Sequence, residues 1–271
     1  MTMVAYICKT CGVQQAPSTR VPGICPICAD ERQYVPESGQ VWTTLAKLQA
    51  NHRNIIVEEE SNLFSVRTDP SVAIGQRALL LKSAEGNILW DCTPLISDEA
   101  VEQIKQLGGL SAIALSHPHF LASVVEWSDA FGGIPIYLHA ADREWVQRSS
   151  PNMVFWEGAT YPLQNGITLI HCGGHFAGSS VLLWGGGADG RGALLTGDTV
   201  HVVPDRRYVS FMYSFPNHIP LRASELIKIG ARLAPHKFDR IYAAWAGSVL
   251  KSGGKAAVER SINRYIAAMK A

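Results

Sequence analysis

His117-Pro118-His119 begins one residue after Ala112 to Leu115, a short apolar run with the length of a buried strand. Side chains two residues apart in an extended chain point in the same direction, so both imidazoles can face one metal ion. Loops that follow strands are also where binding sites lie in sheets flanked by helices. The segment therefore predicts a metal site at the end of a strand.

Two further strand ends carry residues of metal-binding type. His175 lies in the glycine-rich segment 173–179, and Asp198 ends the run that begins at Leu194. Three imidazoles and one carboxylate suit a catalytic divalent ion that keeps one position open for water or substrate. His117, His175 and Asp198 alone would be enough for a mononuclear iron site. We expect the remaining histidines to be ordinary structural or surface residues.

In their order along the chain, these segments resemble the motifs of the metallo-β-lactamase superfamily. His117 and His119 match the first two histidines of the family's HxHxDH motif, and His175 in Gly-His-x-x-Gly-Ser matches the third metal histidine. Asp198 in Thr-Gly-Asp matches the aspartate that can bridge two metal ions. The resemblance implies that these four residues bind one zinc or iron ion, with Asp198 as fourth ligand or as the catalytic base.

The first strands of the same region carry the resemblance as well. Ile74 to Leu81 and Ile88 to Thr93 look like the opening strands of the family, and the likeness covers about residues 53–250. It implies an α+β fold, a four-layer αβ/βα sandwich of two sheets with helices outside. Besides the strands, the apolar periodicity and the capping residues predict helices near 98–107, 123–131, 141–148, 221–233 and 255–269.

The chain departs from the family pattern at the second metal site. Where the motif continues with Asp and His, this chain has Leu121 and Ala122, and where the family has a late histidine it has Ala244-Trp245. Three ligands of the second ion are therefore missing, and the resemblance implies one ion only. The aspartate that orients the nucleophilic water is missing too, which argues against ordinary binuclear hydrolysis.

Four of the six cysteines form two CxxC pairs near the N-terminus, at Cys8, Cys11, Cys25 and Cys28. Four thiolates at this spacing can close a tetrahedron around one metal ion. The segment resembles a rubredoxin-like zinc ribbon over about residues 1–36. Zinc would make it a closed structural site and iron a one-electron carrier, and thiolates accept both.

Composition limits the possible partners and the compartment. The 24 Lys and Arg residues nearly balance the 23 Asp and Glu residues, so no broad positive surface for nucleic acid or a membrane is expected. No signal peptide or membrane span is recognisable, which predicts a cytoplasmic protein. We expect a small-molecule substrate, and the composition is compatible with a homodimer. The predicted organisation is a ribbon at 1–36, a linker at 37–52 and a metallo-β-lactamase-like domain at 53–271.

A basic and aromatic loop follows Asp198. We expect Arg206, Arg207 and Tyr208 of this loop, together with Trp245, to line the substrate pocket, and an arginine there would favour an anionic substrate. The alternative is a loop that only covers the sheet.

Three functions remain open at this point. The first is a mononuclear metal-dependent hydrolase of an ester, thioester or amide, in which Asp198 is the base. The second is a mononuclear non-haem iron oxygenase acting on a thiol or persulfide, as in one branch of the superfamily, with an iron-loaded ribbon as its electron partner. The third is a non-enzymatic protein that has kept the fold.

Overall fold

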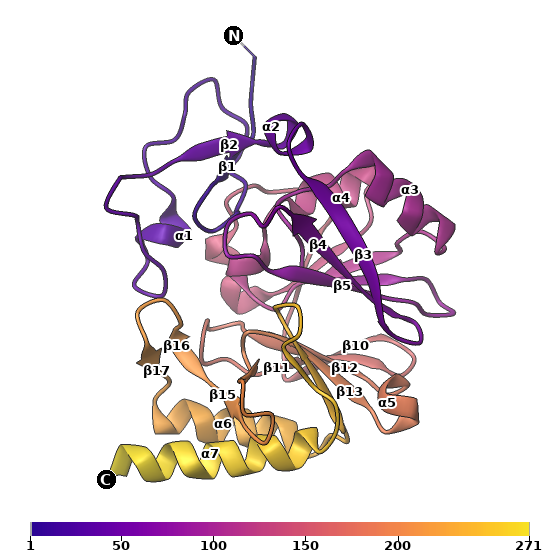
Figure 1. Cartoon of the computed structure of the whole chain (residues 1–271), viewed down its shortest axis with the longest axis vertical. Coiled ribbons are helices and arrows are strands. Elements are labelled where there is room, and N and C mark those ends of the chain that lie inside the picture. The colour runs from indigo at the N-terminus through magenta and orange to yellow at the C-terminus, as the bar shows by residue number, and fades with distance from the viewer. Residues whose placement is uncertain (1, 271) are drawn as a thin grey trace. The chain divides into compact units, whose positions relative to one another are not determined.

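The computed structural model describes residues 2–270, and Met1 and Ala271, the outer limits of the predicted modules, lie outside the described residues. The chain forms two compact units (Figure 1). The N-terminal unit contains the residues up to 138 together with 143–155, and the C-terminal unit contains 139–142 and the residues from 156 onwards. Each unit is built on a mixed β-sheet with helices.

Seven strands in the order β3-β4-β5-β6-β7-β8-β9 form the sheet of the N-terminal unit. Neighbours from β3 to β6 are antiparallel, whereas β6, β7 and β8 run parallel. Strands β5, β6 and β7 are buried along their whole length, as is usual for central strands covered on both faces. The strands are β3 (Arg53–Glu60), β4 (Leu63–Asp69), β5 (Arg77–Leu81), β6 (Ile88–Trp90), β7 (Ala112–Ala114), β8 (Ile136–His139) and β9 (Met153–Trp156).

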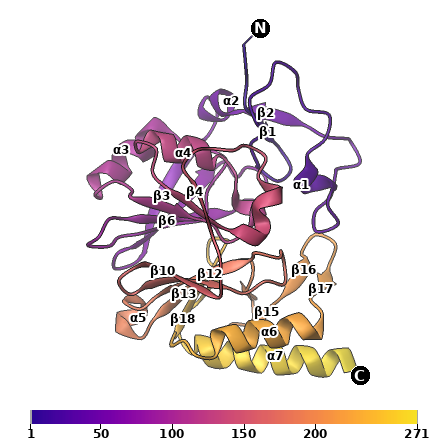
Figure 2. The ribbon, with the colours of Figure 1, turned by 180° about the vertical axis from the view of Figure 1, so that it is seen from behind.

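Two helices make the crossovers between the parallel strands of this sheet. Helix α3 (Asp98–Gln106) connects β6 to β7, and α4 (Val124–Ala130) connects β7 to β8 (Figure 2). Ser97 caps α3, because its hydroxyl accepts a hydrogen bond from Ala100 N at 3.2 Å, a contact typically worth about 1 kcal/mol. Gly108 and Gly109, with φ of 111° and 73°, turn the chain away after the helix.

The cysteine module belongs to the same compact unit as this sheet. Its strand β1 (Tyr6–Cys8) pairs antiparallel with β2 (Trp42–Thr44), so the predicted linker contributes a strand to the module. Two short helices, α1 (Pro26–Ala29) and α2 (Leu45–Gln49), complete this part of the chain. The division at 36 and 52 stays a prediction.

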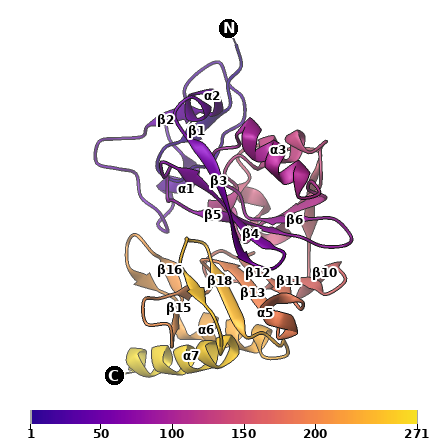
Figure 3. The same cartoon turned by 45° about the vertical axis from the view of Figure 1, so that its right-hand side comes forward.

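Six strands in the order β10-β11-β12-β13-β18-β19 form the sheet of the C-terminal unit, in which only the β13–β18 pair is parallel among the described pairings. Helices α6 (Ala223–Leu233) and α7 (Gly254–Lys270) lie side by side (Figure 3). Helix α6 buries Leu226, Ile229 and Leu233, which recur at helical spacing. The strands are β10 (Thr160–Gln164), β11 (Ile167–His171), β12 (Ser180–Trp184), β13 (Ala193–Gly197), β18 (Arg240–Ala243) and β19 (Val249–Leu250).

Short elements complete the C-terminal unit. The hairpin of β14 (His201–Val202) and β15 (Val209–Ser210) is followed by that of β16 (Met212–Ser214) and β17 (Ile219–Pro220), and α5 (Gly187–Gly190) precedes β13. These hairpins occupy the basic and aromatic loop of the sequence.

The α+β class is confirmed, and so are four of the five predicted helices. The helix expected at 141–148 is wrong, because the chain there forms a 3₁₀ helix over Ala140–Trp145. Its Asp142 side chain turns inward and accepts a hydrogen bond from Gly178 N at 2.6 Å, a tertiary contact that sequence periodicity does not reveal. Among residues 2–270 we find no helix with the length and apolar character needed to cross a membrane.

Candidate metal centres

The four cysteines of the N-terminal module converge on one point. Cys8 ends β1, and Cys11 lies in the following turn. Cys25 precedes α1, and Cys28 lies within it. The sulfur atoms all lie within 4.8 Å of one another, and those of Cys8–Cys28 and Cys11–Cys25 are 3.6 Å apart. All four side chains are buried thiols without disulfides. Four converging sulfurs fit a tetrahedral zinc or iron ion.

The sulfurs perturb one another's protonation. Hydrogen bonds from the thiols of Cys11, Cys25 and Cys28 hold the pKa of Cys8 below its ordinary value. The hydrogen bonds of Cys11 with Cys25, Cys28 and Cys8, together with its burial, raise the pKa of Cys11. Crowded thiols that compete for protons in this way favour replacement of the protons by a cation.

His117 and His119 follow β7 in the N-terminal unit. His117 has extended backbone and precedes the 3₁₀ helix Pro118–Phe120, to which His119 belongs. The expectation that both histidines lie on extended chain is therefore wrong, although the helical turn still brings the rings together, with centroids 5.1 Å apart. Both side chains are buried, which is unusual for polar groups without a structural or binding role.

A carboxylate and a hydroxyl fix the ring of His117. The hydroxyl of Ser116 donates to Asp91 Oδ2 at 3.1 Å and lies 3.0 Å from His117 Nδ1. Because the hydroxyl proton is already donated to the carboxylate, Ser116 accepts from His117, and the imidazole proton lies on Nδ1. Nε2 is then the nitrogen with the lone pair, the form required of a metal ligand.

His175 is fixed in the same tautomer in the C-terminal unit. Its Nδ1 lies 3.1 Å from the backbone carbonyl oxygen of Met212 in β16, and a carbonyl can only accept. Nδ1 therefore carries the proton, and Nε2 carries the lone pair. The loop that carries His175 is held at Gly178, whose backbone N–H donates to the buried carboxylate of Asp142.

Asp198 stands next to His175. It follows β13, and its Oδ2 lies 3.8 Å from His175 Nε2. Burial raises the pKa of this carboxyl to about 7. A buried carboxylate is costly without a counter-charge, and together with an imidazole nitrogen 3.8 Å away it fits a bound cation.

The predicted pocket residues of the loop make contacts of their own. The guanidinium of Arg206 donates to the carbonyl oxygens of Val203 and Gly247, at 2.6 and 2.8 Å. Arg207 pairs with Asp205 at 2.9 Å, and both side chains are exposed.

Tyr208 contacts helix α7, where the guanidinium of Arg264 lies 3.6 Å from its ring centroid. The backbone of the next residue, Val209, donates to Ser261 Oγ in the same helix. This part of the loop is therefore packed against α7, and its role in a substrate pocket stays a prediction.

Trp245 belongs to an aromatic cluster that reaches His175. Its ring packs edge to face against His201 at 5.3 Å and lies 6.2 Å from Phe215, which in turn lies 6.1 Å from His175. The sequence analysis left His201 as an ordinary residue, whereas Phe215 belongs to the aromatic loop expected to form a pocket wall or to cover the sheet. The packing of β14 and the loop after β16 places both rings near His175.

The sequence analysis missed residues that contact the candidate ligands or the loops that carry them. Asp91 and Ser116 orient His117, Asp142 holds the loop of His175, and Gln40 contacts the cysteine cluster. Of these contacts, the sequence indicated only one locally, because Ser116 directly precedes His117.

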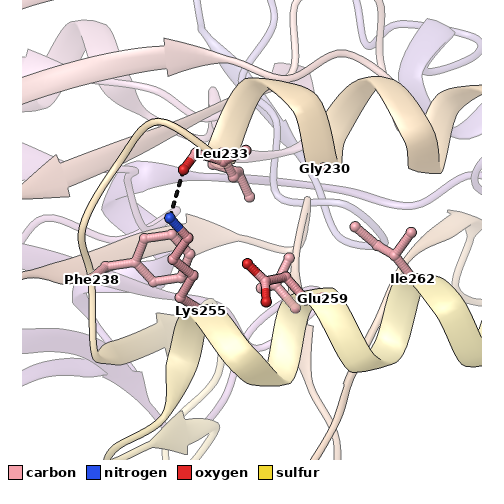
Figure 4. A pocket seen from close by; sticks show the side chains of 8 residues that line it. Gly230, Leu233, Phe238, Lys255, Glu259 and Ile262 are labelled. Carbon is pink, nitrogen blue, oxygen red and sulfur yellow. Dashed lines mark hydrogen bonds between the residues drawn. The ribbon is translucent and has the colours of Figure 1, made fainter.

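An open pocket lies between α6 and α7 (Figure 4). Its walls are mainly apolar, with Leu233, Phe238 and Ile262, and Lys255 Nζ donates to Ala234 O at 2.5 Å. It holds no group of metal ligands among the described residues, so it is distinct from both metal centres.

Known proteins show the same fold. The DIM-1 metallo-β-lactamase superposes with a TM-score of 0.57 at 15% identity, covering 77% of this chain and 98% of that one. FIM-1 from Pseudomonas aeruginosa, solved in a mono-zinc form, gives 0.55 at 12% identity, covering 78% and 96%. A metallo-β-lactamase of Cronobacter sakazakii gives 0.53 at 15% identity, covering 83% and 96%.

The amino-acid sequence has a much nearer relative. No protein-family model matches the chain. The uncharacterized protein YmaE of Bacillus subtilis (strain 168) is 47% identical over 269 residues, which cover 98% of this chain and 97% of YmaE. The chain therefore belongs to the same family as YmaE and has the metallo-β-lactamase fold, with a four-cysteine module of zinc-ribbon type at its N-terminus.

Proposed function

We propose that this protein is a cytoplasmic metal-dependent hydrolase that cleaves an ester, thioester or amide bond of a small molecule. In this proposal His117, His119, His175 and Asp198 together bind one catalytic ion, and the cysteine module binds a second, structural zinc ion. The observation that carries the proposal is the shared tautomer of His117 and His175, each with its proton on Nδ1 and the lone pair of its ring on Nε2.

The donor set suits zinc. Imidazole nitrogens and a carboxylate are its usual ligands in catalytic sites, where one position stays open. A divalent ion bound there would lower the pKa of a water ligand and polarise the carbonyl group of the substrate. His119 completes the histidine set, and the buried carboxyl of Asp198 serves as the fourth ligand or as the acceptor of the water proton.

A single ion also agrees with the substitutions at the second site of the family. Leu121 and Ala122 are apolar and buried, and Trp245 packs against His201. None of the three side chains can donate an electron pair to zinc in the way that Asp or His does. That FIM-1 has been solved in a mono-zinc form supports the view that the fold accommodates one ion.

The metal content of the purified full-length protein tests the proposal. We expect two ions per chain in the wild type, one in His175→Ala and one in Cys25→Ser, while His236→Ala, a histidine outside both clusters, keeps two. Retention of both ions in His175→Ala would contradict the proposed catalytic site.

Activity and metal identity then separate hydrolysis from its alternatives. With zinc in the site, we expect turnover of chromogenic esters and thioesters that is lost in His175→Ala and His117→Ala. Iron in the site together with oxygen consumption on a thiol or persulfide would favour the oxygenase. A filled site without turnover of either class would favour a non-enzymatic role.

A further inference from the structure

Gln40 bridges the two halves of the cysteine cluster. Its side-chain Nε2 lies 3.0 Å from the sulfur of Cys8, and its Oε1 accepts a hydrogen bond from the backbone N–H of Cys25 at 3.2 Å. Cys8 belongs to the first CxxC pair and Cys25 to the second. One carboxamide therefore contacts both pairs at once.

The chemistry of the two contacts fixes the orientation of the amide. The backbone N–H of Cys25 can only donate, so the carbonyl oxygen of the Gln40 side chain must face it. The NH₂ group consequently faces the Cys8 sulfur, which as a thiolate is an acceptor. Reversing the amide would place two donors together at Cys25 and would leave the sulfur facing an oxygen.

The backbone around Gln40 holds it in this place. Gly39, with φ of 88°, turns the chain toward the cluster, and Val41 O accepts from Lys9 N at 3.0 Å at the start of the β1–β2 pairing. The side chain is half-buried beside cysteines that are fully buried. Strand pairing thus delivers a polar group from outside the two CxxC motifs to a ligand sulfur.

We propose that Gln40 is a positioning residue of the cysteine metal site, which stabilises the negative charge on Cys8 by donating a hydrogen bond to its sulfur. Four thiolates around one divalent ion leave a net negative charge, and each N–H donor to a sulfur lowers the cost of that charge in a buried site. This proposal rests on the cysteine cluster binding a metal ion, but not on the hydrolase activity.

Two variants separate donation to sulfur from anchoring at Cys25. Gln40→Glu keeps an oxygen that accepts from Cys25 N and replaces the donating amide with a second carboxylate oxygen beside Cys8. Gln40→Met keeps the chain length and removes both hydrogen bonds. Gln49→Met is the matched control, because Gln49 donates to the carbonyl oxygen of Ile96 and not to a sulfur.

All variants are made in full-length His175→Ala, so that the zinc released comes from the cysteine site alone. The rate of zinc release to an excess of a chelating dye is measured, and so is the sulfur-to-metal charge-transfer absorption of the Co²⁺-loaded protein. We expect Gln40→Glu to release zinc 10- to 100-fold faster than its parent, about the usual effect of removing a group that supports a ligand. The rate of zinc release from Gln40→Met should lie between those of Gln40→Glu and the parent. Gln49→Met should release zinc at the rate of the parent.

The cobalt spectrum distinguishes charge stabilisation from a purely structural role. Loss of the donated hydrogen bond makes the Cys8 thiolate more electron-rich, so the charge-transfer bands should move to lower energy in both Gln40 variants. Parent-like release and spectra in Gln40→Glu would overturn the proposal. It would equally be overturned by Gln40→Met releasing zinc as fast as Gln40→Glu with unshifted bands, or by a cysteine site that binds no ion in the parent.

Discussion

Ser116 decides which nitrogen of His117 can bind a metal. Its hydroxyl is donated to Asp91 and therefore accepts from His117 Nδ1, and Ser116 N also donates to Asp91 Oδ1 at 2.7 Å. The carboxylate thus holds the hydroxyl, and the hydroxyl holds the ring. This chain of contacts is buried, so water cannot replace a missing member at low cost.

Ser116→Ala should weaken zinc binding at the histidine site about 10- to 100-fold, because the ring of His117 loses the group that orients it. The measurement is zinc affinity by competition with a chelator in a Cys25→Ser background. Ser128→Ala removes another buried hydroxyl of the same unit, one that donates to Ile134 O, and should leave the affinity unchanged. Equal losses in both variants would contradict the orienting role.

Cys172 gives a pH dependence that is independent of any metal. Burial raises the pKa of its thiol from 9 to about 12. Above pH 9 the unfolded chain releases a proton that the folded chain keeps, so the free energy of unfolding falls as the pH rises. Relative to Cys172→Ala, the wild type should lose about 1.4 kcal/mol of stability per pH unit above pH 9. Parallel profiles in chemical denaturation would show that the thiol ionises equally in both states.

At the scale of elements, the 3₁₀ helix Ala140–Trp145 and the loop after β11 depend on each other. Asp142 is buried and accepts from Gly178 N, and a Cβ added at Gly178 would lie 2.7 Å from the Asp142 carboxyl carbon. Glycine at this position is therefore a packing requirement of the loop that carries His175.

Gly178→Ala should lower the free energy of unfolding by about 1–3 kcal/mol through overpacking, and it should also reduce the metal content of the histidine site. Thermal unfolding and metal analysis of the purified variant check both effects. Gly23→Ala is the control, since a Cβ there meets nothing within 4 Å. A variant with wild-type stability and metal content would show that the loop adapts.

At the scale of the whole molecule, the cysteine module is part of the unit that carries His117 and His119. Gln14 N donates to Ala122 O at 3.0 Å, and Ala122 adopts a positive φ of 42°, a conformation that costs energy for a residue with a Cβ. Gly12 packs so closely that a Cβ would lie 2.6 Å from Pro94 Cγ. The module therefore supports the segment in which the second-site ligands of the family are replaced.

In the proposed two-ion protein, removal of the ion at the cysteine module should loosen that segment. In Cys25→Ser we expect a lower midpoint of thermal unfolding and faster amide hydrogen exchange over residues 117–124, measured by mass spectrometry. His175→Ala, which lacks the other ion, should leave exchange in the cysteine module unchanged. Exchange over 117–124 at the wild-type rate in Cys25→Ser would show that the module folds independently of the histidine segment.

The sequence alone predicted the strands that precede His117 and Asp198, four of the five expected helices and the two sets of ligand types, because these depend on local periodicity and on short motifs. It did not predict the long strand β3 or the hairpins β14–β15 and β16–β17. Cys8, Cys11, Cys25 and Cys28 converge as their spacing predicted. The tertiary structure decided which groups support the candidate ligands: Asp91 holds Ser116, which contacts His117, while Met212 contacts His175 and Gln40 contacts Cys8. In the chain, Asp91 lies 25 residues from Ser116, Gln40 lies 32 from Cys8 and Met212 lies 37 from His175, and only the pairing of strands and the packing of loops brings them together.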